Sequence, residues 1–174
     1  IDVELSEEFD RNDFFPYSQV AFNYQKLGEY EKSKQYYFKA FSIAETNSGP
    51  NSNDVAFILE GLSISYRGGR TYYNKKDFKE VQNIRNKILN IKIKTFGKDH
   101  IEVANSYHHL SGLYSTKGLY SEAIRLNKYA IEIADKFNDN YKEWYEPIPL
   151  YRAYLYSQIA TNYYSIADYR NAKI

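Results

Sequence analysis

The sequence predicts an all-α fold in which antiparallel helix pairs stack into a solenoid of about seven to eight helices. Aromatic and aliphatic residues recur every three or four residues, which places them on one face of a helix. A similar stretch also returns along the chain, because Tyr24, Tyr72, Tyr114 and Tyr163 lie 48, 42 and 49 residues apart within it. We therefore expect residues 1–174 to form a single repeat domain.

The repeat is clearest in residues 107–132, which read as two short helices joined by a tight turn. Three residues share one face of the first helix: Tyr107, Leu110 and Tyr114. Gly118 marks the turn, since a residue without a Cβ lets the chain reverse at little steric cost. Ala123 and Ala130 follow on the second helix, with Leu126 between them. These small residues let the two helix backbones approach closely.

The same pattern occurs near the start of the chain, where Tyr24, Gly28, Tyr30 and Ala40 match Tyr114, Gly118, Tyr120 and Ala130. It predicts helices over 13–26 and 30–46. Asn12 or Asp13 is the expected N-cap of the first, because short polar side chains bond the free amides of a helix start. The turn formers of residues 47–53 predict a loop.

The second unit matches less well. Residues 54–75 read as one long helix, with Gly68-Gly69 inside it and Lys76 in place of the turn glycine. Each mid-helix glycine costs roughly 1 kcal/mol relative to alanine, so we expect Gly69 to sit where a neighbouring helix comes close, or the helix to kink. A paired helix over 77–95 follows. Its predicted inner face consists of Val81, Ile84, Ile88 and Ile91.

The joint at residues 96–104 contains helix-end signals. Gly97 is the expected C-cap of the preceding helix. Asp99, followed by Glu102 three residues later, has the spacing of a capping box and predicts the next helix start. His100 is interpreted as a solvated turn residue.

The last unit repeats the first at a distance of 139 residues, with Tyr156 and Ala160 in the places of Tyr17 and Ala21. Residues 137–149 are a predicted loop, and a further helix is expected to begin at Tyr169 and to run past the last residue. The approximate units are therefore 13–47, 54–95, 99–136 and a truncated 149–174. If the small residues mark helix crossings, Ala21, Ala123 and Ala160 are all buried.

This ladder of Tyr, Leu, Gly and Ala resembles the tetratricopeptide repeat (TPR). Residues 79–135 are similar to its kinesin light chain-type variant of 42 residues, with Ile101 in place of a usual proline and His108-His109 in place of an Asn pair. The resemblance implies a right-handed superhelix and a role as a protein- or peptide-binding scaffold. The alternative is a regulatory or sensor domain of the peptide-receptor type, within a larger bacterial signalling protein or enzyme whose active domain lies outside this sequence.

The resemblance also implies a concave groove lined by the first helix of each pair. Counting from Tyr17, Tyr107 and Tyr156 and from the corresponding point near Tyr66 gives groove positions, to which we add Lys26 and Arg67 as neighbours. The predicted peptide-binding residues are Phe22, Gln25, Lys26, Tyr66, Arg67, Arg70, Tyr73, His108, Ser115, Ser157, Thr161 and Tyr164, with Ser18 and Gly112 at further groove-facing positions. Arg70 and Tyr73 together favour a peptide that carries a carboxylate or acidic residues.

The composition excludes several other functions. The chain has 23 Lys and Arg against 22 Asp and Glu, so no net field favours nucleic acid. It has no cysteine and no apolar run of about 18 residues, so neither disulfides nor a membrane span is expected. Its 20 tyrosines suit semi-buried packing positions, and an aromatic binding groove is the alternative. The chain starts at Ile1, contains no methionine and shows no secretion signal, so we expect a cytoplasmic fragment of a longer protein.

No residue pattern predicts catalysis, a metal site or a cofactor. His108 and His109 are adjacent, so on a helix they point about 100° apart and cannot share a metal. No glycine-rich loop follows a strand, and the serines, histidines and acids lack the spacing of a catalytic site. The expected partner is a protein or peptide, and the sequence does not predict an oligomeric state.

Overall fold

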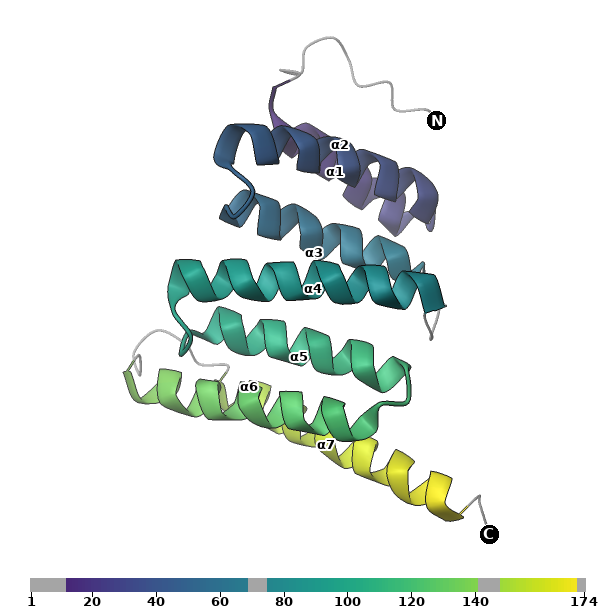
Figure 1. Ribbon diagram of the computed structural model, residues 1–174, viewed down its shortest axis with the longest axis vertical. Coiled ribbons are helices and arrows are strands. Elements are labelled where there is room, and N and C mark those ends of the chain that lie inside the picture. The colour runs from purple at the N-terminus through teal and green to yellow at the C-terminus, as the bar shows by residue number, and fades with distance from the viewer. Residues whose placement is uncertain (1–11, 69–74, 141–147, 172–174) are drawn as a thin grey trace. The chain divides into compact units, whose positions relative to one another are not determined.

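The computed structural model describes residues 12–68, 75–140 and 148–171, and every regular element in these ranges is an α helix (Figure 1). The seven helices are α1 (Phe14–Lys26), α2 (Tyr30–Ser48), α3 (Asn53–Arg67), α4 (Lys75–Phe96), α5 (Ile101–Thr116), α6 (Tyr120–Asn140) and α7 (Ile148–Asn171). The predicted all-α fold is therefore confirmed.

The chain forms two compact units, each larger than one of the predicted repeats. From here on, the first unit means residues 1–91 and the second unit means residues 92–174. In the first unit α1 packs on α2, α2 packs on α3, and α1 also contacts α3. Its core joins small residues of α1 and α2 to branched aliphatic residues of α3 and α4. Among them are Ala21, Ala40, Ala44, Val55, Ile58, Leu62, Ile84, Ile88 and Ile91. In the second unit α6 packs on both α5 and α7.

In each of two helix pairs, one buried serine forms a hydrogen bond between the two helices. In the first unit the hydroxyl of Ser33 on α2 donates to the carbonyl of Ala21 on α1, at 2.8 Å. In the second unit the hydroxyl of Ser111 on α5 donates to the carbonyl of Ala123 on α6, also at 2.8 Å. The two helix pairs cross in the same way, but the serine and the alanine have exchanged helices. Ala21 corresponds to Ser111, and Ser33 corresponds to Ala123. Both alanines are fully buried, as predicted, because the two helices of each pair meet at these positions.

The turns after α1 and α5 have the same geometry. Gly28 and Gly118 adopt left-handed conformations with φ of 79° and 77°. In the first turn the amide of Glu29 donates to the carbonyl of Tyr24, and in the second the amide of Leu119 donates to that of Tyr114. These are Schellman turns, which suit glycine because its lack of a Cβ removes the penalty of positive φ. Both predicted turn glycines are thus confirmed.

The predicted helix over 54–75 is wrong. Helix α3 ends at Arg67, and Gly68 ends it in a left-handed conformation with φ of 57°. Gly68 therefore serves as a helix terminus, which is where glycine is favourable, and not as a costly mid-helix residue. The glycine at a close approach is Gly61, since a Cβ on it would lie 2.2 Å from Cζ of Tyr37. Gly69 and the side chain of Lys76 lie outside the part of the chain that the structure describes.

The start of α5 also differs from its prediction. Gly97 ends α4 as expected, with φ of 84°, but the N-cap of α5 is His100, whose Nδ1 accepts from the amide of Glu102 at 3.2 Å. Its ring stacks on Phe96 at 4.7 Å and meets Phe137 edge-on at 5.0 Å. The predictions of Asp99 as N-cap and of His100 as a solvated residue are therefore wrong. Asp99 instead pairs with Lys136 at 3.2 Å.

Helix α7 departs from the predicted hairpin as well. It continues to Asn171 without a turn before Tyr169. The residue 139 positions after Gly28 is Ala167, and alanine favours helix where glycine would have ended it. Ala160 is exposed, so its predicted burial is wrong. Among the described helices, none covers that side of α7. By contrast, Val81, Ile84, Ile88 and Ile91 of α4 are buried as predicted.

Candidate functional site

The first unit has a groove between its two first helices, α1 and α3. We call it the α1–α3 groove, and its volume is about 370 Å³. Its lining residues are Ser18, Gln19, Phe22 and Gln25 of α1, Tyr37 of α2, and Phe57, Glu60, Gly61 and Ile64 of α3.

The walls of the α1–α3 groove carry large apolar side chains that the fold leaves in water. Phe22 is 44% exposed, Phe57 is 51% exposed and Ile64 is 49% exposed. Single exposed apolar residues are common on proteins, but a cluster around a concavity is typical of interaction sites. Lys26 lies at the rim, with its Nζ 5.1 Å from the centre of the Phe22 ring. The rim thus adds one cation to a groove that also contains the carboxylate of Glu60.

The floor of the groove depends on one glycine. The ring of Tyr37 lies directly against Gly61, where any Cβ would overlap it. Tyr37 is only 4% exposed, and burial raises the pKa of its phenol. The hydroxyl therefore stays neutral at physiological pH. Gly61 allows Tyr37 of α2 to reach the base of the groove, which would otherwise be closed by α3.

A chain of hydrogen bonds fixes the separation of the groove walls. Gln25 on α1 donates through Nε2 to the carbonyl of Gly61 at 3.1 Å and to the hydroxyl of Ser65 at 2.9 Å. Ser65 also bonds to Ser33 at 2.8 Å. These bonds join α1, α2 and α3 through buried hydroxyls whose partners are satisfied. Gln25 lines the α1–α3 groove, and its side-chain amide already donates to two protein partners.

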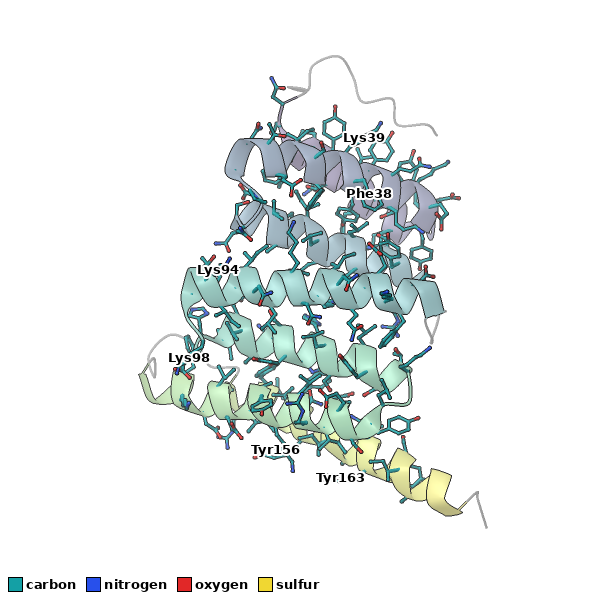
Figure 2. The ribbon with its side chains drawn as sticks, in the orientation of Figure 1. Phe38, Lys39, Lys94, Lys98, Tyr156 and Tyr163 are labelled. Carbon is teal, nitrogen blue, oxygen red and sulfur yellow. The ribbon has the colours of Figure 1, made fainter. Side chains whose placement is uncertain are left out.

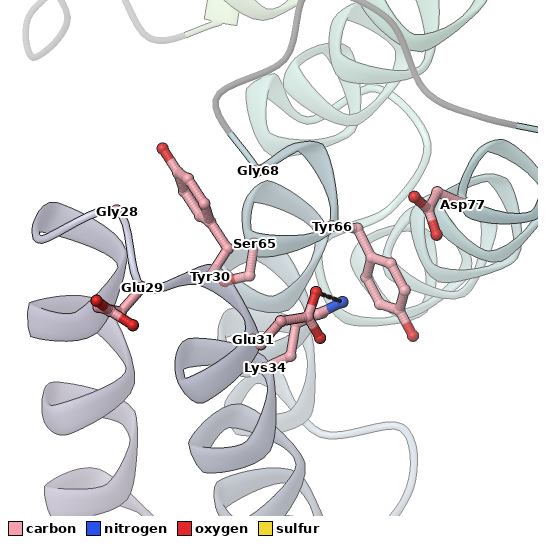
Figure 3. Close-up of a pocket in the computed structure, with 9 residues that line it drawn as sticks. All are labelled: Gly28, Glu29, Tyr30, Glu31, Lys34, Ser65, Tyr66, Gly68 and Asp77. Atoms are coloured by element: carbon pink, nitrogen blue, oxygen red, sulfur yellow. Dashed lines mark ion pairs between the residues drawn. The ribbon is translucent and has the colours of Figure 1, made fainter.

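Tyr66 lies in a different place, a pocket beside the hairpin turns (Figure 3). The ammonium of Lys34 sits 5.0 Å from the centre of the Tyr66 ring and pairs with Glu31 at 2.8 Å. Burial, followed by the negative charges of Glu80, Asp77 and Glu31, raises the pKa of Tyr66. The structure therefore does not bring Tyr66 together with Phe22 and Gln25. Arg67 is exposed at the end of α3, and Arg70 and Tyr73 lie outside the described residues.

In the second unit, His108 and Ser115 take part in packing between helices. The hydroxyl of Ser115 on α5 donates to Oδ1 of Asn162 on α7, at 2.8 Å. Nδ1 of His108 lies 3.3 Å from Oδ1 of Asn127, and its ring meets Tyr154 edge-on at 5.1 Å. Both residues thus hold α5 against its neighbours.

Three further predicted residues lie on the exposed side of α7: Ser157, Thr161 and Tyr164. The hydroxyl of Thr161 donates to the carbonyl of Ser157 at 2.9 Å, and Tyr164 is 74% exposed. None of the three is bonded to α5 in the contacts described above. In the second unit, His108 and Ser115 thus contact neighbouring helices, whereas Ser157, Thr161 and Tyr164 are exposed on α7.

The sequence reasoning missed the α3 side of the groove, namely Phe57, Glu60, Gly61 and Ile64. A signal was present, because Gly61 and Gly68 are seven residues apart, as are Ala21 and Gly28. That spacing would have placed Gly68 at the helix end. The Tyr72 alignment used instead favoured a helix that extends beyond Arg67.

Two other features are missing from the part of the chain that the structure describes. No group of three or more His, Cys, Asp or Glu side chains there is placed to hold a metal ion. None of the helices in the described ranges combines the length and apolar character that crossing a membrane requires.

Part of the chain matches a family model, and the chain is similar to several solved structures. Residues 69–136 match the model of the tetratricopeptide repeat family. The crystal structure of BtubC (BKLC) from P. vanneervenii is similar with a TM-score of 0.72 and 20% identity over 92% of this chain, which spans 59% of BtubC. No curated protein sequence matches the chain.

Two crystal structures of TPR-like repeats from a putative kinesin light chain of Podosopora anserina are also similar. One has a TM-score of 0.58, and the other has a TM-score of 0.57. Each is 13% identical over 94% of this chain, which covers 91% and 92% of them respectively. At such identities these structures show a shared fold. Residues 69–136 are therefore similar to tetratricopeptide repeats in sequence, and the similar structures show that the chain shares the fold of such repeats.

Proposed function

We propose that the chain is a protein- or peptide-binding scaffold and that the α1–α3 groove receives the ligand. The observation that supports this proposal most strongly is the exposure of Phe22, Phe57 and Ile64 around one concavity. Folding of the first unit leaves these side chains in water, although burying each fully is worth about 1.5–3 kcal/mol. Because each is already about half buried, a partner that covers them gains roughly half of this energy.

The shape and chemistry of the groove favour a bulky apolar side chain as the anchor of the ligand. Such a side chain would lie between Phe22 and Phe57, above Tyr37 and Gly61. Aromatic residues in a concave site supply much of the binding energy of peptide interfaces. Lys26 at the rim would favour an acidic residue or a carboxylate next to the anchor. Arg70 and Tyr73, which we predict to extend the site, would add to the same preference.

The groove walls are set before any ligand binds. Gln25, Ser65 and Ser33 connect α1, α2 and α3 by hydrogen bonds of 2.8–2.9 Å. A preformed site avoids the entropic cost of ordering its walls on binding. The anchor contacts that we propose therefore lie on rigid helices of the first unit, and no ligand contact is assigned to His108 or Ser115.

A peptide array, followed by calorimetry on the peptides selected, tests this proposal. Phe22→Ala and Phe57→Ala should each weaken binding by about tenfold or more, which corresponds to about 1.4 kcal/mol. Phe15→Ala is the matched control, because Phe15 is similarly exposed on α1 but does not line the groove. Equal affinities for all three variants and the unmodified chain would contradict the proposal.

A further inference from the structure

The α1–α3 groove has an acidic side chain on one wall and a basic side chain on the other. Within the described part of the chain, Glu60 is the only lining residue with a formal charge, and it is half-buried on α3. Lys26 belongs to α1, and its Nζ lies 5.1 Å from the centre of the Phe22 ring. The two walls of the groove therefore differ in the sign of their charge.

Hydrogen bonds and ring contacts fix the register between the two walls. Ser33 of α2 contacts Ser65 of α3, and Tyr37 further along α2 contacts the earlier Gly61. Helix α3 is thus antiparallel to α2, as α1 is, so α1 and α3 run in the same direction. Nε2 of Gln25 donates to the hydroxyl of Ser65 at 2.9 Å, which places these two residues at the same height.

From this register, Glu60 and Lys26 lie at different heights along the groove. Glu60 precedes Ser65 by five residues, and Lys26 follows Gln25 by one. At 1.5 Å per residue, their backbone positions are separated by roughly 9 Å along the helices. Phe22 lies at a height between them. An acidic, an aromatic and a basic position therefore follow each other along the groove.

A ligand whose anchor fills the middle of the groove brings its neighbouring residues beside both charges. An extended peptide rises about 3.3 Å per residue, so the separation of Glu60 and Lys26 corresponds to about three residues. Opposite charges at these places would form ion pairs, whereas like charges would repel each other while losing water. Such charge complementarity selects among ligands more than it adds to affinity.

We propose that the occupant of the α1–α3 groove is a peptide segment whose bulky apolar residue lies between a basic residue and an acidic residue. The basic residue pairs with Glu60, the acidic residue pairs with Lys26, and the two are about three positions apart. This rests on the proposed function, since it concerns the ligand of the same groove. Glu60 is then a residue that determines specificity.

Blocked peptides with one central phenylalanine test the proposal. They carry Arg or Asp on each side of the phenylalanine, about three positions apart, in every combination of signs, and calorimetry measures their affinities. For the unmodified chain, the better of the two mixed-sign peptides should bind about fivefold more tightly than either like-sign peptide. This ratio should fall in about 0.5 M salt, which screens exposed charges.

Charge reversal at Glu60 tests its role directly. Glu60→Lys should make the peptide with two acidic residues the tightest ligand, and Glu60→Gln, which keeps the size of the side chain, should remove the preference at this position. Glu31→Lys is the matched control, because it changes the net charge equally but Glu31 does not line the groove. A preference that Glu60→Lys and Glu60→Gln leave unchanged would overturn the proposal.

The basic position has a corresponding test. Lys26→Glu should make the peptide with two basic residues the tightest ligand. Lys39→Glu is the control, since Lys39 is exposed on α2 and does not line the groove (Figure 2). The same peptide preference in both variants would overturn the assignment of Lys26.

Failure of this charge order can be told apart from failure of the proposed function. If all sign combinations bind equally well and Phe22→Ala weakens each of them, the charge order is wrong although the groove receives the ligand. If no peptide of this set binds, the charge order is also wrong, and the peptide array decides separately whether the groove binds other sequences.

Discussion

The first helices of neighbouring repeats make different contacts in the two units of the molecule. These helices are α1 and α3 in the first unit and α5 and α7 in the second. Ser18, Phe22 and Gln25 of α1 are each 90 residues before His108, Gly112 and Ser115 of α5. In the first unit, the small Ser18 and the large Phe22 border an open groove against α3. In the second unit, the large His108 makes ring contacts with Tyr154 and Tyr151 of α7, at 5.1 and 6.4 Å.

One kind of contact is common to both units. Gln25 bonds to Ser65 of α3, and Ser115 bonds to Asn162 of α7, so the same repeat position joins adjacent first helices in each case. The helices are therefore held by similar polar contacts. The side chains beside these contacts differ in size, since Phe22 of the first unit corresponds to Gly112 of the second.

The largest expected effect concerns the small residues at equivalent positions of α1 and α7. Ala21→Arg should destabilise the first unit by more than about 4 kcal/mol, because Ala21 is fully buried and a charged side chain there would be unpaired. Ala160→Arg, at the same repeat position but exposed, should change unfolding free energy by less than about 0.5 kcal/mol when measured in dilute protein. Urea unfolding of both variants measures the two values. Similar losses of stability would show that the two positions are not differently buried.

Glycine-to-alanine substitutions should have opposite signs in the two units. Gly61→Ala should destabilise by about 1–3 kcal/mol, since the added Cβ overlaps the ring of Tyr37. Gly112→Ala should stabilise by about 0.5–1 kcal/mol, because Gly112 is helical, has open space around it and gains the helix propensity of alanine. Thermal unfolding should therefore shift the midpoints in opposite directions. A rise for Gly61→Ala would contradict the close contact between Tyr37 and α3.

The exchanged serine and alanine predict a smaller effect that can be reversed. Ser111→Ala removes the hydrogen bond to Ala123 and should cost about 1 kcal/mol. Adding Ala123→Ser would recreate the arrangement of the first unit, in which the serine is on the second helix. Part of the lost stability should return in the double variant. If the double variant is less stable than the sum of the single changes, the two crossings are not equivalent.

The smallest effect is expected at high pH. Burial raises the pKa of Tyr37 above its ordinary value of 10.0, which the unfolded chain keeps. The stability that depends on the neutral phenol is therefore complete below pH 10.0 and is lost as pH rises toward the folded-state pKa. Tyr37→Phe should lessen the fall in unfolding free energy between about pH 9 and about pH 11. An unchanged pH profile would mean that Tyr37 does not contribute to it.

Much of the fold could be predicted because small residues and turn glycines leave periodic signals. Asp13, Gly28, Gly97 and Gly118 end or start helices where the sequence places them. The errors have physical causes. Gly68 ends α3, but aligning Tyr72 with Tyr24 and Tyr114 puts Lys76, and not Gly68, at the position of the turn glycines. His100 replaces Asp99 as N-cap because an imidazole nitrogen can also accept from a backbone amide.

The candidate site was only partly predictable, because a groove depends on pairs of helices. The positions on α1 were found from the repeat, as Phe22 and Gln25 show. Their partners Phe57 and Ile64 could not be predicted, because the residue at which α3 ends sets the alignment of this helix with α1, and that residue was predicted wrongly. In the second unit, the repeat gives the position of His108 but cannot show that Tyr151 and Tyr154 contact it. Such contacts depend on tertiary packing, which sequence period alone does not contain.

The most direct test of the open α1–α3 groove is a nuclear magnetic resonance titration with a peptide selected from the array. We expect the amide signals of α1 and α3 around Phe22, Phe57 and Ile64 to shift on binding, while those around His108 and Ser115 remain in place. Shifts centred on α5 and α7, with none on α1 and α3, would contradict ligand binding in this groove.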